Sequence, residues 1–201
     1  MRLRPRESRS HERFVQVWGV HETVRESATR GWVITLARVG ESSARRVPLA
    51  LVVAAVVVVA DQATKFWAER TLTGREPIPV IGDFIQFRLL YNPGAAFSMG
   101  ANATWLFTII AAIAAGWLLW YVTRPHPVSR VIVFSLLLGG ATTHLIDRLF
   151  REPGFARGHV VDFIDYNGWF VGNVADIALV VGAACAIVLT ARQPEPAEKQ
   201  D

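Results

Sequence analysis

The chain is poor in residues that form crosslinks or bind metals. Its 201 residues include one cysteine, Cys185, which excludes an internal disulfide and a cysteine metal cluster. The sequence also lacks a Walker phosphate loop, a Gly-x-Gly-x-x-Gly fingerprint and a paired Cys-x-x-Cys motif. His144 and His159 are too few for a zinc site without carboxylates. We therefore expect no metal and no cofactor.

Basic residues are in excess, giving a net charge of +4, but they are concentrated in a few places. Residues 1–46 hold ten arginines and no apolar run long enough to span a membrane. We expect them to form a basic, disordered cytoplasmic extension, and not a signal peptide, because no small-residue cleavage site follows the next apolar run. We interpret the charge as a topology signal and expect no nucleic-acid partner.

Long apolar segments dominate the rest of the chain, of which 52% is hydrophobic overall. Four such segments run over residues 47–67, 103–122, 128–146 and 171–191. Each approaches the roughly 20 residues that cross a hydrocarbon core about 30 Å thick. The sequence thus predicts a mainly α, polytopic membrane protein with one four-span domain over residues 47–191 and a cytoplasmic tail over residues 192–201.

The flanking charges predict how the four spans are oriented. Arg45 and Arg46 precede the first span, the basic loop RPHPVSR joins the second to the third, and Arg192 follows the fourth. By the positive-inside rule these places are cytoplasmic, so both termini are expected there. The long loops 68–102 and 147–170 are then expected on the outer side.

The first outer loop carries a period-two pattern. In the sequence IQFRLLY, residues 85–91, apolar side chains at odd positions alternate with Gln, Arg and Leu, and Asn92-Pro93-Gly94 follows. This pattern predicts a strand with one apolar face that stops at a turn. We expect a small amphipathic β-sheet that forms a cradle at the outer membrane surface.

Ionisable side chains near the spans are functional candidates, because each costs roughly 2.5–3.5 kcal/mol to insert into a membrane. All of them fall at outer ends of spans or in outer loops: Asp61, Lys65, His144, Asp147, Arg148, Asp162 and Asp176. Asp61 and Lys65 have the spacing of a helical i, i+4 ion pair, which either holds the helix end or forms part of a site wall. We interpret Asp147 and Arg148 as scaffolding.

Asp162 and Asp176 are the strongest candidates for chemistry. Asp162 follows a short strand-like run, and Asp176 lies in the first turn of the fourth span, where the helix N-terminus favours a negative charge. If the two carboxylates meet, they share one proton and can activate a water against a peptide bond. Helix capping and loop hydrogen bonding fit the spacing equally well, and Asp165 is a competing partner for either acid.

Four motifs together resemble the signal peptidase II family of bacterial lipoprotein signal peptidases. They are DQATK from Asp61, YNPGAAFS from Tyr91, GGATTHLIDRL from Gly139, and GHVVDFID with GNVAD from Gly158. They occur in the family's order and the resemblance covers about residues 47–190. It implies an intramembrane aspartyl endopeptidase of the bacterial plasma membrane that cleaves prolipoproteins immediately before a diacylglyceryl-modified cysteine.

The resemblance also implies roles for individual residues. Asp162 and Asp176 correspond to the catalytic pair. Supporting or substrate-binding roles fall on Asp61, Lys65, Asn92, Gly94, His144, Arg148 and Asn173. The expected partners are diacylglyceryl-modified prolipoproteins and membrane phospholipid, and the chain is expected to be a monomer.

Two positions depart from the family pattern. Thr143-His144 stands where the family usually has Gly-Asn, and Gly172 stands where it usually has Phe. The first departure concerns substrate contacts and leaves the catalytic pair intact, and a histidine there would make the site sensitive to pH near neutrality. A noncatalytic scaffold that retains the fold remains an alternative, as does a small transporter or proton relay, which predicts carboxylates spread through the membrane depth.

Overall fold

The computed structural model describes residues 46–94 and 103–192, all within the second of two units of the chain, residues 43–201. Residues 1–45 of the extension expected over residues 1–46, and the end of the tail from residue 193, lie outside the described residues. So do Phe97 and Ser98 of the YNPGAAFS motif.

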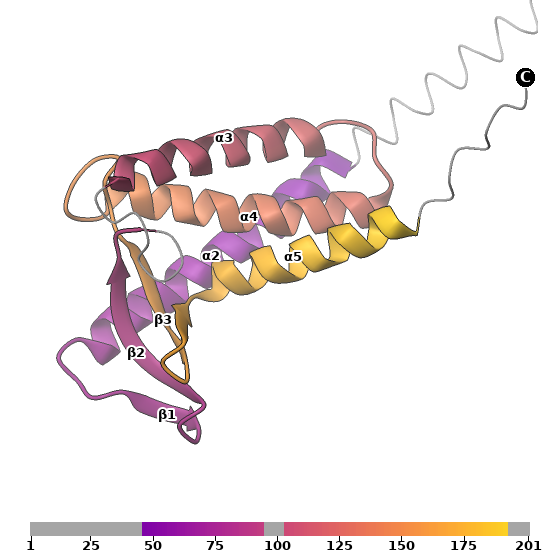
Figure 1. Ribbon diagram of the computed structural model, residues 1–201. Coiled ribbons are helices and arrows are strands. Elements are labelled where there is room, and N and C mark those ends of the chain that lie inside the picture. The colour runs from indigo at the N-terminus through magenta and orange to yellow at the C-terminus, as the bar shows by residue number, and fades with distance from the viewer. Residues whose placement is uncertain (1–45, 95–102, 193–201) are drawn as a thin grey trace, which may run out of the picture. The chain divides into compact units, whose positions relative to one another are not determined.

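Four helices make up most of the described unit: α2 (Arg46–Leu72), α3 (Thr104–Val122), α4 (Val128–Phe150) and α5 (Val174–Ala191) (Figure 1). Each is long and apolar enough to cross a membrane. The prediction of a mainly helical protein with four spans is confirmed.

Three helix ends differ from the predicted ones. Helix α2 continues to Leu72 and α4 to Phe150, beyond the predicted ends at residues 67 and 146. Helix α2 persists beyond its apolar run because Ala68 and Leu72 are buried against Phe163 of the sheet. The fourth helix begins three residues later than predicted, because residues 170–172 pair with a neighbouring strand.

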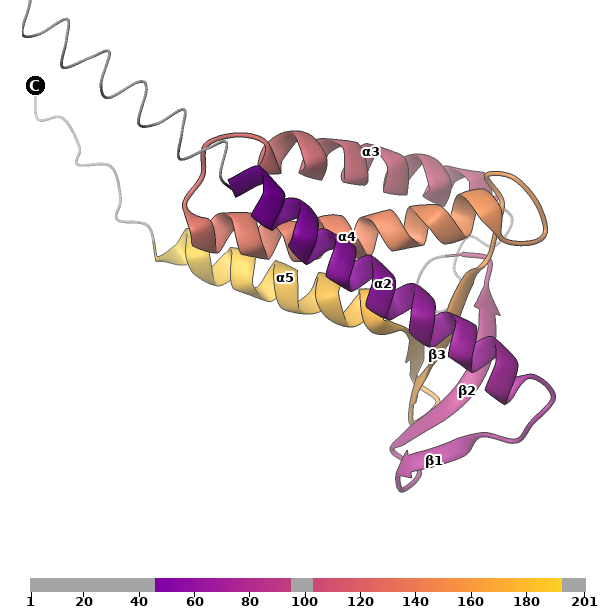
Figure 2. The same cartoon turned by 180° about the vertical axis from the view of Figure 1, so that it is seen from behind.

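Helix α4 is central and packs against α2, α3 and α5 (Figures 1 and 2). Two adjacent glycines on α4 allow this close approach. A Cβ atom on Gly139 would lie 2.6 Å from the Cβ of Val57 on α2, and one on Gly140 would lie 2.6 Å from Cγ of Leu179 on α5. Small residues at helix contacts are typical of membrane bundles, where close van der Waals packing drives association.

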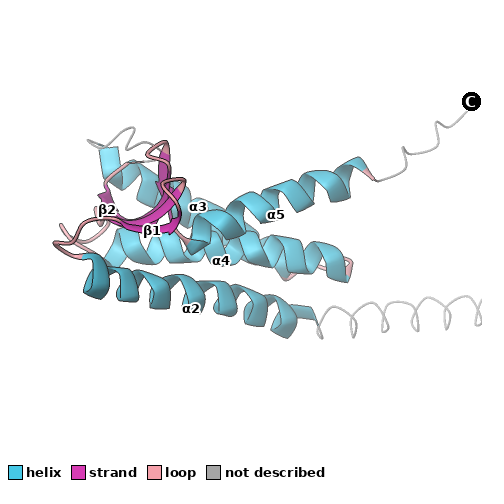
Figure 3. Cartoon of the chain, turned by 90° about the horizontal axis from the view of Figure 1, so that it is seen from below, coloured by secondary structure: helices cyan, strands magenta, loops and turns pink. Residues whose placement is uncertain are grey.

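A four-stranded antiparallel sheet lies at the end of the bundle where α2 and α4 end and α5 begins (Figure 3). Its strands, in spatial order, are β1 (Ile78–Ile81), β2 (Ile85–Asn92), β3 (Val160–Tyr166) and β4 (Phe170–Gly172). The strand predicted over residues 85–91 is therefore confirmed.

The sheet is amphipathic, as predicted. Phe87 and Leu89 of β2 pack with Phe163 against α2, and the ring of Trp67 meets that of Phe87 edge-on at 5.2 Å between centroids. A bulge follows Phe87, since β2 advances three residues to Leu90 while β3 advances two. After this bulge the chain reaches Asn92, whose buried side chain turns toward β3.

Candidate active site

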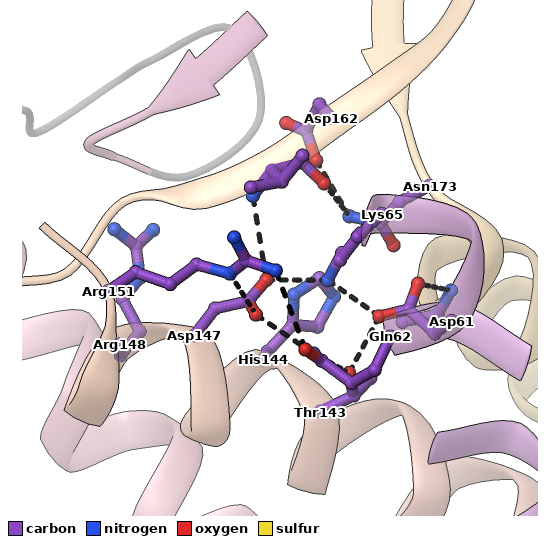
Figure 4. Close-up of polar contacts among 12 residues, drawn as sticks. Asp61, Gln62, Lys65, Thr143, His144, Asp147, Arg148, Arg151, Asp162 and Asn173 are labelled. Carbon is purple, nitrogen blue, oxygen red and sulfur yellow. Dashed lines mark hydrogen bonds and ion pairs between the residues drawn. The ribbon is translucent and has the colours of Figure 1, made fainter. Parts of the chain in front are cut away.

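A buried ion cluster joins α2 to α4 (Figure 4). The Nζ atom of Lys65 lies 2.6 Å from Oδ2 of Asp61 and 2.6 Å from Oδ2 of Asp147, and all three side chains are 0% exposed. Asp61 and Lys65 thus form the i, i+4 pair that their spacing predicted. Because each buried charge has an opposite partner, removing one partner would leave another charge uncompensated.

Neutral and cationic donors complete the ion cluster. Thr143 Oγ1 donates to Asp61 Oδ2 at 2.6 Å, Gln62 Nε2 donates to Asp147 Oδ1 at 2.9 Å, and Arg151 Nε donates to the same Asp147 atom at 2.7 Å. Sequence reasoning did not single out Gln62 or Arg151. Both lie one helical turn from cluster members, at i, i+3 to Lys65 and i, i+4 to Asp147, which is the signal that could have identified them.

The ion cluster also fixes where α5 begins. The second carboxylate oxygen of Asp61, Oδ1, accepts a hydrogen bond of 2.9 Å from the backbone N–H of Ala175 in the first turn of α5. Such an N–H has no partner within its own helix. Asp61 therefore couples α2 to the helix end that carries Asn173 and Asp176, although it does not line the pocket described below.

Asn173 connects the two predicted catalytic acids. Its side-chain oxygen accepts from the Asp176 backbone N–H at 3.1 Å, and its own N–H donates to Asp176 Oδ2 at 2.9 Å, which forms a capping box. Its Nδ2 donates to Asp162 Oδ1 at 2.7 Å (Figure 4). The capping role of Asp176 is thus present, but it occupies only one of the two carboxylate oxygens.

Asp162 lies on β3 and is 2% exposed. Its second oxygen, Oδ2, accepts from Asn92 Nδ2 at 3.0 Å. Within the described residues, no lysine or arginine forms an ion pair with this carboxylate. Burial raises the pKa of Asp162 to about 6, and the charge of Asp176 adds to the rise, against the lowering by amide hydrogen bonds and by His144.

His144 on α4 reaches the other acid. Its Nε2 lies 3.2 Å from Oδ1 of Asp176, the oxygen that the capping box leaves free. The side chains of His144 and Asp176 are 19% and 27% exposed, so both are accessible from a cavity. The two carboxylates therefore have different surroundings, amides for Asp162 and an imidazole with a helix N-terminus for Asp176.

Arg148 positions backbone and does not pair with a carboxylate. Its Nη1 donates to the carbonyls of Asn92 at 3.1 Å, Pro93 at 3.0 Å and Gly158 at 3.1 Å, and its Nη2 donates to the carbonyl of Gly94. Gly94 in turn donates its N–H to Asn92 Oδ1 at 3.0 Å. One guanidinium thus holds the turn after β2 against the segment before β3, which fixes the amide of Asn92 next to Asp162.

The two acids share a pocket of about 210 Å³ at the sheet end of the bundle. Its lining is Asn92, Gly94, Phe107, Ala111, His144, Arg148, Val160, Asp162, Phe170 and Asp176. Most of the predicted site residues therefore meet in one place, while Asp61 and Lys65 lie behind it. Asp165 was a competing partner, but it pairs with Arg88 at 3.0 Å and does not line this pocket.

The Gly172 departure has a structural reason in this chain. A Cβ atom on Gly172 would lie 2.6 Å from Cε1 of Phe170 and 2.8 Å from Oδ2 of Asp176. The ring of Phe170, two residues earlier in the same strand, thus occupies the space that a side chain at position 172 would need. Sequence reasoning missed Phe170, which lines the pocket.

Among the described residues, no group of three histidine, cysteine, aspartate or glutamate side chains is arranged to hold a metal ion.

Fold and site together define a class of protein: a polytopic membrane protein whose four helices and end sheet enclose two carboxylates in one pocket.

The comparisons place the chain within this class. The model of the family described as signal peptidase (SPase) II matches residues 53–192. The chain belongs to the signal peptidase II family. The described fold is similar to a bacterial membrane enzyme solved by the in meso method at 2.3 Å resolution, with a TM-score of 0.64 and 27% identity over 77% of this chain and 94% of that one.

Named relatives agree with the family model. The chain is 44% identical over 146 residues to the lipoprotein signal peptidase of Mycolicibacterium smegmatis, covering 73% of this chain and 62% of that protein. It is 40% identical to the Leifsonia xyli protein of the same name, covering 70% and 66%, and 42% identical to that of Mycobacterium avium, covering 73% and 80%. The match thus spans slightly less than two thirds of the first two relatives.

Proposed function

We propose that this protein is an aspartyl endopeptidase that removes the signal peptide from prolipoproteins. Cleavage falls immediately before the diacylglyceryl-modified cysteine. The observation that carries the proposal is the shared pocket of Asp162 and Asp176, in which neither carboxylate pairs with a lysine or arginine of the described chain. Family membership supports the peptidase class.

The proposed chemistry needs one proton shared between the two acids. The ionised carboxylate takes a proton from a water, whose oxygen attacks the scissile carbonyl. The protonated acid donates its proton to the carbonyl oxygen. When the tetrahedral intermediate collapses and the C–N bond breaks, that acid takes back a hydroxyl proton, and the amine takes up the proton that the other acid accepted from water. Water is consumed, and one new carboxyl group and one new amine are formed. The pKa of Asp162, which burial raises to about 6, supports an acid that still holds its proton at pH values where an ordinary aspartate has lost it.

Supporting residues keep this pair in place. Asn92 and Asn173 each donate to one oxygen of Asp162, which fixes the plane of its carboxylate. Arg148 holds the turn that carries Asn92, and Gly94 in that turn lines the pocket. Asp61 and Lys65 act at a distance, by anchoring the first turn of α5 below Asp176.

An apolar groove adjoins the pocket and suits a substrate that arrives from the bilayer. Its volume is about 420 Å³, and its lining is Tyr166, Phe170, Asp176, Ile177, Leu179, Val180 and Val181. Groove and pocket share Phe170 and Asp176. In our proposal the signal helix enters sideways along α5, while the acyl chains of the modified cysteine stay among membrane phospholipids.

The basic residues support an orientation with both termini in the cytoplasm. Arg46, Arg124, Arg130 and Arg192 lie at the helix ends opposite the sheet (Figure 1). By the positive-inside rule, that end faces the cytoplasm. The pocket then lies near the outer face of the plasma membrane, where an exported cleavage site emerges. We propose that the chain acts there as a monomer.

Cleavage of a diacylglyceryl-modified prolipoprotein by the purified chain in detergent tests the proposal, with the unmodified precursor as the matched control. We expect turnover of the modified precursor alone. Asp162→Asn and Asp176→Asn should each lower the rate by at least about 10³-fold, in the range of lost acid–base catalysis. Retained turnover in either variant contradicts the catalytic pair, and no turnover by folded wild-type protein favours the noncatalytic scaffold.

A further inference from the structure

The two acids of the pocket receive different kinds of hydrogen-bond donor. Both oxygens of Asp162 face neutral side-chain amides, from Asn92 and Asn173. For Asp176, one oxygen faces the backbone N–H of Asn173, the N-cap residue of α5, and the other faces His144 Nε2 at 3.2 Å. An imidazole can carry a positive charge, which an amide cannot. His144 is therefore the one feature in the described lining that can supply a titratable positive charge to the pair.

The other charged groups around His144 are already engaged. On α4 itself, Asp147 belongs to the ion cluster, and Arg148 binds backbone carbonyls. Of the charged groups on α2, Asp61 and Lys65 pair with each other, and Glu69 pairs with Arg151. Helix α3 contributes only the uncharged Phe107 and Ala111 to the pocket lining.

The groups left to face His144 are therefore Asp176 on α5 and, across the pocket, Asp162 on β3. Direct contact is with Asp176, whose carboxylate also lies at a helix N-terminus that favours a negative charge. Asp162 is almost fully buried, whereas the Asp176 side chain is 27% exposed. Burial favours the neutral form of an acid, and a positive charge favours the ionised form. The charge of His144 also acts on Asp162, but the direct contact of the imidazole is with Asp176.

We propose that His144 is a positioning residue that keeps Asp176 as the ionised member of the pair and thereby leaves the shared proton on Asp162. This inference rests on the proposed peptidase function and specifies which acid accepts a proton and which acid donates one. Asp176 takes the proton of the attacking water, and Asp162 donates to the carbonyl oxygen. The imidazole acts through Asp176 and does not exchange protons with the substrate.

The test is a comparison of pH–rate profiles for wild type, His144→Asn and His144→Leu. Asparagine keeps a neutral donor and loses the charge, whereas leucine loses both. A histidine can be protonated and then carries a positive charge, which asparagine cannot do at any pH. We expect the acidic limb of the His144→Asn profile to move to higher pH by about one unit, so that the variant is about tenfold slower than wild type near pH 5.

The same variant should lie within about twofold of wild type near pH 7.5, because the amide keeps a neutral N–H donor for Asp176. His144→Leu should show the shifted limb together with a loss of at least about tenfold at every pH, in line with a lost hydrogen bond to a charged group. His159→Asn is the matched control, because His159 does not line the pocket, and its profile should follow that of wild type.

Three outcomes overturn the inference. These are an unmoved acidic limb in His144→Asn, a uniform loss at all pH values without displacement, and a displaced limb in His159→Asn. Thermal unfolding in detergent identifies a variant that fails to fold, and His144→Gln, a longer amide, then replaces it. If wild type does not cleave, or the Asp162 and Asp176 variants still do, the proposed function fails. If those results stand and only the His144 profiles match wild type, the inference alone fails.

Discussion

Two groups of carboxylates lie at the same end of the bundle, all buried except the half-buried Asp176, and they differ in their partners. Asp61 and Asp147 share the ammonium of Lys65, with 2.6 Å to each. Asp162 and Asp176 are held by amides, a backbone N–H and an imidazole. Burial alone therefore does not make a carboxylate reactive. A carboxylate with a permanent positive partner stays ionised, whereas one with neutral donors can hold or release a proton.

The largest expected effect tests the first group. Lys65→Met should lower the free energy of unfolding by about 3–5 kcal/mol, because it leaves the buried carboxylate of Asp61 without a cation and Asp147 with Arg151 alone. Equilibrium unfolding in a graded mixture of mild detergent and dodecyl sulfate measures this change. The double variant Lys65→Met with Asp147→Asn should recover part of the loss. A change below about 1 kcal/mol in the single variant would show that the cluster is not a structural anchor.

The next effect tests the second group. Asn173→Ala should lower kcat for the modified precursor by about 10- to 100-fold, because Asp162 loses an amide that orients its carboxyl group and α5 loses its cap. The lost cap should also lower the unfolding free energy by about 1 kcal/mol. Gln86→Ala, which removes an exposed amide of the same sheet, is the control and should change neither quantity. An unchanged kcat in Asn173→Ala contradicts the role given to this bridge.

The pH dependence of stability separates the groups further. The pKa of Asp162 is raised from 3.8 to about 6 in the folded protein, mainly by burial. Its contribution to stability is therefore fully present below about pH 4 and is lost as pH rises through about 6. Asp162→Asn removes this loss and should stabilise the protein by about 1–2 kcal/mol at pH 7, less than the full shift because the amide accepts on one oxygen only.

Unfolding curves for wild type and Asp162→Asn at pH 4 and pH 7 measure this difference. The variant should gain stability relative to wild type between the two pH values. A constant difference between the two proteins would mean that Asp162 titrates alike in the folded and unfolded states.

The smallest effect comes from an ion pair outside both groups. Arg88 is 47% exposed and lies 3.0 Å from Asp165 on the neighbouring strand. Arg88→Met should lower the unfolding free energy by about 1 kcal/mol, because water and salt screen the exposed guanidinium, while the Asp165 side chain, 7% exposed, keeps the N–H of Gly168 as a donor. The difference between the losses of unfolding free energy in Arg88→Met and Lys65→Met measures how much burial of the cation increases the stabilisation by an ion pair. A loss as large as that of Lys65→Met would remove the distinction.

Local sequence determined the features that depend on near neighbours along the chain. The lengths of the apolar runs predicted the four helices, and alternation predicted β2. The spacing of Asp61 and Lys65 predicted their contact, because residues four apart lie on one helix face. The resemblance of the motifs to signal peptidase II agrees with the family match. Helix ends were less well predicted, since burial against the sheet extends α2 beyond its apolar run.

Tertiary structure decided which polar groups from different helices and strands meet. Asp147 and Arg148 are adjacent in sequence, yet Asp147 joins Lys65 while Arg148 turns to backbone carbonyls, because successive helical residues point in different directions. Asp162 and Asp176 lie on different elements, and the packing of β3 against the start of α5 brings them into one pocket. The contact of His144 with Asp176 depends on the close approach of α4 and α5 at Gly140, a long-range contact that residue spacing cannot encode.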